Sequence, residues 1–363
     1  MKARASVGTD AWYAAAGPED DVVLSTRVRL ARNLANYPFP PHFARDDAEH
    51  VQALVFDSFA HGEHPESFHA LAATDLDELG AKILSERGVI DEGAKEMPGS
   101  GIVMRTDGNV ACTVNTDDHV RISAFVAGLD GNAAYALCRQ LDEDLQKSLQ
   151  FAASYDFGFL TSSVLDCGSG MKVSARVHLP SVSFAGTLHD LVAELGEKGI
   201  EVAACFGAGQ GSGASLGAYY QISARQSAVG SEFDQMAAVV SAVRYVAECE
   251  RRERKAVVRS RPTEMRDAVC RAFATMRFAS LMPLREAVDS IGKLKWGMDA
   301  GIAGGVTDSD LCALLYRIQD GHLQFVLKNG SFRFPADIAK DRTLQTERLR
   351  AVIMQESFER LTM

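Results

Sequence analysis

The sequence of 363 residues predicts an α+β fold, in which helices flank a mostly antiparallel sheet and a smaller all-helical domain follows. Strand-like and helix-like patterns are mixed through the first 255 residues. Several strand-like segments follow one another with no helix between them, which favours antiparallel pairing over a doubly wound sheet. Beyond residue 256 the strand-like patterns nearly vanish. We therefore expect two domains, 1–255 and 256–363.

Periodicity predicts the elements of each domain. Apolar residues at helical spacing predict helices over residues 46–60, 132–149, 188–198 and 232–255 in the first domain. Alternation predicts strands over residues 101–105, 110–115, 120–125, 172–179, 202–206 and 218–223. The turn residues 106–109 (TDGN) indicate a hairpin between the first two strands. In the second domain we expect helices over residues 263–282, with Thr263 as cap, and over 283–296, 308–320 and 343–361.

Composition narrows the classes of function. A net charge of −10 argues against nucleic acid as the main partner. No apolar stretch approaches the ~20 residues of a membrane helix, and the N-terminal residues lack a signal-peptide core. Seven cysteines, widely spread and never in a C-x-x-C pair, suit reduced thiols rather than disulfides or a zinc site. We expect a cytoplasmic protein that contacts neither membrane nor nucleic acid.

Two polar clusters have unremarkable interpretations. Residues 251–255 (RRERK) suit a solvated helix end and linker, with contact to an acidic partner as the alternative. Residues 61–69 contain three histidines, but a proline and uneven spacing favour an exposed loop over a metal site.

Residues 24–33 (LSTRVRLARN) form the first segment that carries chemistry. If extended, the segment places Ser25, Arg27 and Arg29 on one face. Two neighbouring guanidinium groups repel each other unless an anion lies between them, and their fixed donor geometry suits phosphate oxygens. A pair of surface arginines bonded to carboxylates is the alternative.

Residues 114–122 (VNTDDHVRI) form the second segment. Two adjacent carboxylates, a histidine and an arginine between strand-like residues suit either a catalytic corner or a polar hairpin turn.

Two further segments contain glycine turns. Residues 168–180 (GSGMKVSARVHLP) alternate, so that Lys172, Ser174, Arg176 and His178 share one face, which is either a wall of an anion site or an ordinary solvent-facing strand. Residues 207–217 (GAGQGSGASLG) offer backbone N–H groups to a phosphate, but they match neither a P-loop nor a dinucleotide fingerprint. A flexible surface loop is the alternative.

Together, in this order and at these separations, the segments resemble the four signature blocks of the ATP:guanidino phosphotransferases (phosphagen kinases). The helical second domain, and the absence of the helical N-terminal domain of creatine and arginine kinases, make the chain similar to bacterial protein arginine kinases of the McsB type. The resemblance implies the phosphagen-kinase fold, ATP and Mg²⁺ as cofactors, arginine side chains of proteins as acceptors, a homodimer, and Clp-type protease or regulator partners.

The resemblance also implies roles for individual residues. In the family, arginines clamp the phosphates, a carboxylate orients and deprotonates the guanidinium, and a cysteine thiolate assists. By this match the catalytic positions are Asp117 and Ser163. The implied ATP-binding residues are Ser25, Thr26, Arg27, Val28, Arg29, Arg121, Lys172, Ser174, Arg176, Gly207, Gly209 and Gln210. The match gives no protein ligand to a metal.

Several of these positions depart from the family pattern. The family's N-E-E-D-H block reads N-T-D-D-H here, so Thr116 and Asp117 replace two glutamates. Ser163 replaces the cysteine, with Cys167 four residues further on. Lys172 replaces an arginine, Cys205 or Phe206 falls where another arginine stands, and Gln210 replaces a glutamate.

Two hypotheses follow from this pattern. The first is a protein arginine kinase that transfers the γ-phosphoryl group of ATP, with reduced activity. The second is a nucleotide-binding pseudokinase that regulates protein quality control or binds phosphoarginine. In the family a C-terminal R-D-x-x-R-A motif binds phosphoarginine, and residues 340–345 (KDRTLQ) are the nearest match.

Overall fold

The computed structural model describes residues 11–42, 44–91, 93, 96–206, 215–226, 230–359 and 361–362. An eight-stranded sheet has the order β2-β3-β4-β5-β1-β8-β10-β9, and β6 pairs with β7 in a separate hairpin. The strands are β1 (Val23–Arg32), β2 (Phe68–Ala72), β3 (Gly101–Arg105), β4 (Val110–Val114), β5 (Val120–Ala127), β6 (Ala153–Ser154), β7 (Gly158–Phe159), β8 (Met171–His178), β9 (Ile200–Ala204) and β10 (Tyr219–Ala224). Strand β1 pairs with β5, the strands β2, β3, β4 and β5 pair in succession, and β6 pairs with β7, all antiparallel. The predicted α+β class is confirmed.

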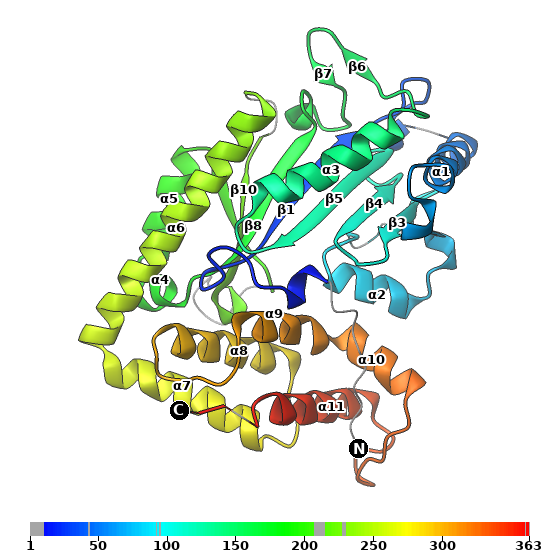
Figure 1. Cartoon of the computed structure of the whole chain (residues 1–363). Helices are drawn as coiled ribbons and strands as arrows, with labels where there is room; N and C mark the ends of the chain where they lie inside the picture. Colours follow the sequence, from blue (N-terminus) through cyan, green and yellow to red (C-terminus); the bar gives the residue numbers. More distant parts are fainter. Residues whose placement is uncertain are drawn as a thin grey trace. The chain divides into compact units, whose positions relative to one another are not determined.

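Helices flank the sheet and make up the C-terminal part of the chain (Figure 1). They are α1 (Arg45–Ala60), α2 (Glu78–Glu86), α3 (Gly131–Leu145), α4 (Pro180–Ala185), α5 (Leu188–Glu197), α6 (Glu232–Ser260), α7 (Pro262–Phe278), α8 (Leu284–Asp299), α9 (Asp308–Arg317), α10 (Asp320–Asn329) and α11 (Arg342–Ser357). Within the part of the chain that the structure covers, no helix combines the length and apolarity needed to cross a bilayer.

Contacts divide the chain into two compact units that interleave along the sequence. The first unit comprises Met1–Pro18, Ser25–Ala175 and Ser223–Ser241. The second comprises Glu19–Leu24, Arg176–Ile222 and Ala242–Met363. Strands β1, β8 and β10 and helix α6 each contribute residues to both units.

Most predicted elements are present within a few residues, and the differences have local causes. Pro262 occupies the first turn of α7 and Arg261 the cap position, so Thr263 as cap was wrong; proline suits this position because its missing N–H is not needed there. Helices α2, α4 and α10 and strands β6 and β7 were not predicted. Neither was β2, which takes in the end of the histidine-containing segment that we expected to be a loop.

Alternation in β1 and β5 creates two unlike faces in the first unit. In the register, Arg27 lies opposite Phe125, Arg29 opposite Ser123, and Ala31 opposite Arg121. The other face is apolar and fully buried where α3 packs on β5, and it includes Val28, Leu30, Ile122 and Ala124. Burial of Val28, Leu30 and Ile122 contributes ~1.5–3 kcal/mol each. A shift of the register by one residue would expose these side chains, so their burial also fixes which side chains lie on the polar face.

Candidate functional site

Arg27, Arg29 and Arg121 lie on one face of the sheet, which we call the arginine face. In the antiparallel register, Arg121 is the diagonal neighbour of Arg29, because it stands two residues from Ser123, the direct partner of Arg29. Arg27 donates from Nε to Ser174 Oγ of β8 at 3.3 Å, and its guanidinium lies 5.8 Å from the centre of the Phe125 ring. Diagonal neighbours on one face are within reach of long side chains. The structure therefore brings together three of the cations that the sequence singled out.

The two diagonal arginines are close enough to affect each other. Burial, followed by the nearby positive charge of Arg121, lowers the pKa of Arg29, while the charges of Asp91, Asp166 and Asp117 oppose this effect. Among the residues that the structure describes, the guanidinium of Arg29 has no hydrogen-bond or ion-pair partner. Such an arrangement of like charges is suited to receive an anion.

Arg121 is buried, and the acidic side chains of the site pair with it. It forms ion pairs with Asp117 and, at 3.5 Å, with Asp91. Its Nε is also buried and has no hydrogen-bond partner within the described ranges. A buried guanidinium N–H without a partner is uncommon in proteins and suits an incoming oxygen ligand.

The turn between β4 and β5 presents Asp117. Asn115 adopts a left-handed conformation, with φ of 52°, which asparagine tolerates better than most residues. Its Nδ2 donates to the carbonyls of Ala48 and Gly99 at 2.7 and 2.8 Å. These bonds anchor the turn, and Asp117 extends from its tip with a side chain that is 67% exposed.

The two residues after Asp117 point inward. Asp118 accepts from Asn33 Nδ2 at 2.8 Å and from the backbone N–H of Ser162 at 2.7 Å. His119 accepts from the Leu34 N–H through Nδ1 and donates through Nε2 to the Pro38 carbonyl. Burial lowers the pKa of His119 to about 4, so the ring is neutral near pH 7. The sequence left two interpretations of residues 114–122 open, a catalytic corner and a polar hairpin turn. Asp118 and His119 have the structural role of a polar turn, and of these three residues only Asp117 faces outward.

Residues 160–167 form a closed loop that carries Ser163. The backbone groups of Phe159 and Gly168 bond each other at 2.8 and 3.0 Å, which joins the two ends of the loop. Ser163 is exposed, and its carbonyl accepts from Thr161 Oγ1 at 2.7 Å. Cys167 is half-buried and bonds within the same loop. Through its bond to Ser162, Asp118 ties this loop to the turn that carries Asp117.

The remaining predicted residues have varied positions. Thr26 and Val28 alternate to the helix-covered face, where Thr26 Oγ1 donates to the Gly128 carbonyl at 2.7 Å, so these two can meet a ligand of the arginine face only through the backbone. Ser25 is buried and Lys172 half-buried. Gly207, Gly209 and Gln210 lie outside the described residues.

Arg176 and His178 belong to the second unit, and neither is an ordinary solvent-facing residue. Arg176 donates to the Tyr316 hydroxyl. His178 is fully buried against the ring of Tyr219, 4.7 Å between ring centres, so the alternative of a solvent-facing strand was wrong for this residue.

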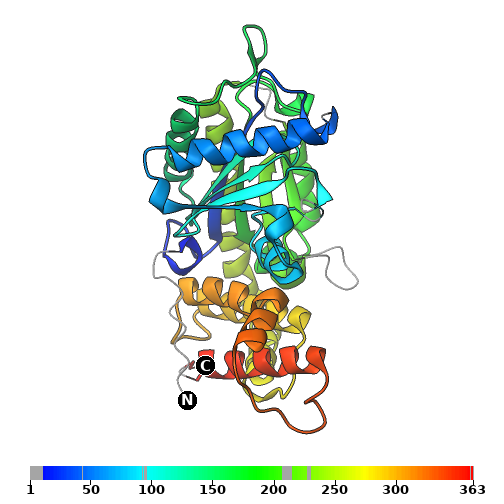
Figure 2. The same ribbon diagram turned by 90° about the vertical axis from the view of Figure 1, so that its right-hand side faces the viewer.

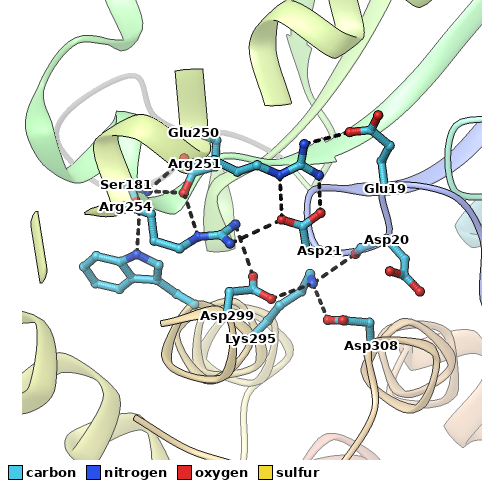
Figure 3. Close-up of polar contacts among 11 residues, drawn as sticks. Glu19, Asp20, Asp21, Ser181, Glu250, Arg251, Arg254, Lys295, Asp299 and Asp308 are labelled. Atoms are coloured by element: carbon cyan, nitrogen blue, oxygen red, sulfur yellow. Dashed lines mark hydrogen bonds and ion pairs between the residues drawn. The ribbon is translucent and has the colours of Figure 1, made fainter. Parts of the chain in front are cut away.

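A second group of charges, which sequence reasoning missed, lies in the second unit (Figure 3). Arg251 pairs with Asp21 and, at 2.8 Å, with Glu19. Arg254 lies 3.3 Å from Asp21, and further acids, Glu250 and Asp299, lie within 4 Å of it. The interpretation of residues 251–255 as a purely solvated helix end was therefore wrong for these two arginines.

Hydrogen bonds and nearby cations offset part of the free-energy cost of burying the acids of this group. Glu250 accepts the backbone N–H groups of Ser181 and Val182 at 3.0 Å, yet burial raises its pKa to about 7. Burial likewise raises the pKa of Asp299 to about 7, against the charges of Lys295 and Arg254. Lys295 pairs with Asp308 and donates to the Asp20 carbonyl at 3.1 Å. We call these residues the paired network; they are Glu19, Asp20, Asp21, Glu250, Arg251, Arg254, Lys295, Asp299 and Asp308.

No group of three or more His, Cys, Asp or Glu side chains within the described ranges is arranged to hold a metal ion. The carboxylates nearest the arginine face are engaged with the arginines themselves.

Comparisons with known proteins show which family the chain resembles in sequence and in fold. Residues 50–253 match the family model of the ATP:guanido phosphotransferase C-terminal catalytic domain, and residues 262–362 match that of the protein-arginine kinase McsB C-terminal domain. A protein-arginine kinase of Halothermothrix orenii is 30% identical over 86% of this chain and 89% of its own length. Another, from Brevibacillus brevis, is 28% identical over 95% of this chain and 96% of its own.

Solved structures share the fold. The duplicated taurocyamine kinase of Schistosoma mansoni aligns with a TM-score of 0.57 and 20% identity, over 68% of this chain and 36% of that one. Lombricine kinase aligns with a TM-score of 0.54 and 18% identity, over 64% of this chain and 67% of that one. The chain therefore belongs to the ATP:guanido phosphotransferase family and, by its matched C-terminal domain and its protein-arginine kinase relatives, to the McsB type.

Proposed function

We propose that this protein transfers the γ-phosphoryl group of ATP to arginine side chains of proteins, at a rate limited by its substituted catalytic positions. The observation that carries the proposal is the arginine face, on which Arg29 and Arg121 are diagonal neighbours and Arg29 has no partner among the described residues. Phosphoryl transfer depends chiefly on positioning the reactants and neutralising charge, and this cluster supplies positive charge at a protein surface.

The proposed roles follow from the positions of the side chains. Arg27, Arg29 and Arg121 hold the phosphates, with Lys172 as a further cation. Asp117, exposed at the tip of its turn, orients the acceptor guanidinium and takes its proton. A bond forms between a guanidinium nitrogen and the γ-phosphorus, the bond from the γ-phosphorus to the β-phosphate oxygen breaks, and ADP leaves.

Mg²⁺ enters the proposal as part of the nucleotide substrate. Bound to the phosphates, it neutralises part of their charge. The described residues offer no carboxylate cluster for a resident ion, so we assign the metal to ATP and no protein ligand to it.

The pseudokinase hypothesis has its own supporting observation. Asp117 already pairs with Arg121, so proton transfer to this carboxylate requires that the pair separates when substrates bind. Aspartate is also one methylene shorter than glutamate, and a misplacement of ~1 Å can cost ~10²-fold in rate. Nucleotide binding without turnover on any protein is the result that favours this hypothesis.

The test is ATP-dependent phosphorylation of a basic protein by the purified chain, followed by mass spectrometry under non-acidic conditions that preserve phosphoarginine. We expect phosphoarginine from the wild type and at least a hundredfold less from Asp117→Ala. Asp57→Ala is the matched control, because Asp57 is an equally exposed carboxylate on α1. Equal product from wild type and Asp117→Ala removes Asp117 as the base.

The homodimer, the Clp-type partners and the cytoplasmic location remain proposals drawn from the resemblance. Sedimentation of the purified chain tests the first of them.

A further inference from the structure

An exposed group of apolar side chains lies beside the loop that carries Ser163. It consists of Tyr155 and Phe157 on the hairpin of β6 and β7, and Val164 and Leu165 in the loop; we call it the apolar ledge. Val164 is 81% exposed and Phe157 66%. The hairpin projects from the sheet in both views (Figures 1 and 2). Phe157 and Val164 line the same surface hollow, and exposed apolar groups that gather in this way mark interaction sites.

The ledge is held in place by its backbone. Phe159 and Gly168 bond each other in both directions, and Gly158, with φ of 65°, lies so close that an added Cβ would stand 2.6 Å from the Gly168 carbonyl oxygen. Below, the guanidinium of Arg32 lies 3.7 Å from the centre of the Phe159 ring and bonds Asp142 at 2.9 Å. The apolar residues are thus presented by a fixed scaffold, which lowers the entropic cost of binding.

The ledge borders a surface hollow of about 960 Å³. Its lining includes Phe157, Phe159 and Val164, and also residues 230–232. A hollow of this size accommodates a few side chains of a peptide.

The charge of the surrounding segment favours a basic occupant. Between Lys147 and Lys172 the only charged residues are Asp156 and Asp166, and there is no cation. Glu232 adds a third carboxylate to the lining of the hollow. Apolar surface with acidic neighbours complements a segment that carries both an arginine and a bulky apolar side chain.

We infer that the apolar ledge binds the residues next to the target arginine of a protein substrate, and so selects arginines flanked by bulky apolar side chains. The inference rests on the proposed function for the identity of the occupant. Its direct support is continuity: Ser163, at the candidate catalytic position, immediately precedes Val164 of the ledge. A segment whose arginine reaches Ser163 places its neighbouring residues over Val164 and Leu165.

The experiment measures binding without ATP, so that it does not depend on catalysis. Two fluorescein-labelled nonapeptides each contain one central arginine, flanked on both sides by leucine in one and by serine in the other. Fluorescence anisotropy gives their affinities for the wild type, for the double variant Val164→Ser with Leu165→Ser, and for Phe157→Ser. Phe278→Ser is the matched control, because Phe278 is equally exposed but lies on α7 in the second unit.

We expect the wild type and Phe278→Ser to bind the leucine peptide about tenfold more tightly than the serine peptide, in line with discrimination by one apolar contact. The two ledge variants should bind both peptides with the weaker affinity. Equal affinities in the wild type, or a preference that survives in both ledge variants, would overturn the inference.

Two further outcomes separate the occupants and the proposals. If the wild type sediments as a dimer, the ledge variants as monomers, and no peptide preference exists, the ledge binds a second copy and the inference is wrong. If the leucine preference is present but no protein is phosphorylated, the proposed phosphotransfer fails while the ledge as a binding surface stands.

Discussion

The arginines of the arginine face and those of the paired network differ in how far neighbouring acids neutralise their charge. In the network, Arg251 and Arg254 each meet two or more acids, and the acids in turn accept backbone N–H groups or pair with Lys295. On the arginine face, Arg29 has no hydrogen-bond or ion-pair partner among the described residues, and burial, followed by the positive charge of Arg121, lowers its pKa. In the paired network, neighbouring side chains neutralise each charge. On the arginine face, like charges repel each other, and a bound anion would remove this unfavourable free energy.

Removal of a network arginine should have the largest effect on stability. Arg254→Ala leaves the buried Glu250 without its cation and Asp299 with Lys295 alone, and breaking a buried pair in this way costs ~3–5 kcal/mol. Urea denaturation should show this loss, while Arg252→Ala, an exposed neighbour on the same helix, should change the unfolding free energy by less than ~0.5 kcal/mol. Equal midpoints for the two variants would mean that the network does not stabilise the fold.

The second prediction concerns pH. The pKa of Asp299 is raised from 3.8 to about 7, so the folded state binds more protons than the unfolded state between these values. The free energy of unfolding should therefore fall as the pH rises through this window, and Asp299→Asn should flatten the curve by ~2–4 kcal/mol. Denaturation at pH 5 and pH 8 measures the difference. Asp267→Asn, at an exposed carboxylate, should follow the wild type; parallel curves for all three would exclude the assigned cause.

On the arginine face the expected loss is in binding and not in stability. Arg29→Gln should weaken ATP binding by ~10–100-fold, the value of one charge-assisted hydrogen bond or two. The unfolding free energy should stay within ~1 kcal/mol or rise, because repulsion with Arg121 is removed. Calorimetry with ATP and a thermal melt test both halves of this prediction. Arg139 is an exposed arginine on α3, so Arg139→Gln should leave ATP affinity and melting temperature unchanged. If Arg29→Gln melts at a much lower temperature but binds ATP normally, Arg29 contributes to stability and not to ATP binding.

The smallest effect is expected at Ser163. Ser163→Cys restores the thiol that the family carries, and the exposed position allows it to ionise. We expect kcat to rise by less than about tenfold with KM unchanged, since Asp117 still limits proton transfer. Ser163→Ala should match the wild type. A fall in kcat for the alanine variant would show that the serine hydroxyl itself takes part.

Periodicity predicted the sheet and most helices because the buried faces of these elements recur at fixed intervals. The same alternation placed Arg27 and Arg29 on one face, and the strand order then determined that Arg121 joins them. No such periodicity predicts which way neighbouring residues in a turn point. Asp117 and Asp118 are chemically identical in the sequence, and only the bonds of Asp118 to Asn33 and Ser162 distinguish them.

Long-range pairing explains what could not be predicted. Arg251 meets Glu19 and Asp21 across more than 200 residues of sequence, and nothing local to residues 251–255 indicates these partners. Arg176 similarly meets Tyr316, which no strand pattern reveals. Helix α10 (Asp320–Asn329) lies almost entirely beyond residues 308–320, the last segment before residue 343 for which we predicted a helix.

The two backbone hydrogen bonds between Phe159 and Gly168, which we call the clasp, hold the ends of residues 160–167 together. These bonds involve none of the side chains within the loop. Substitutions at positions 164–166 leave both clasp bonds intact, so natural variation can alter these residues while Ser163 stays where it is. In evolutionary terms the segment is an exchangeable module. Transplanting residues 164–166 between members of the family is consequently a route to engineer which proteins are recognised, without redesign of the phosphate-binding strands.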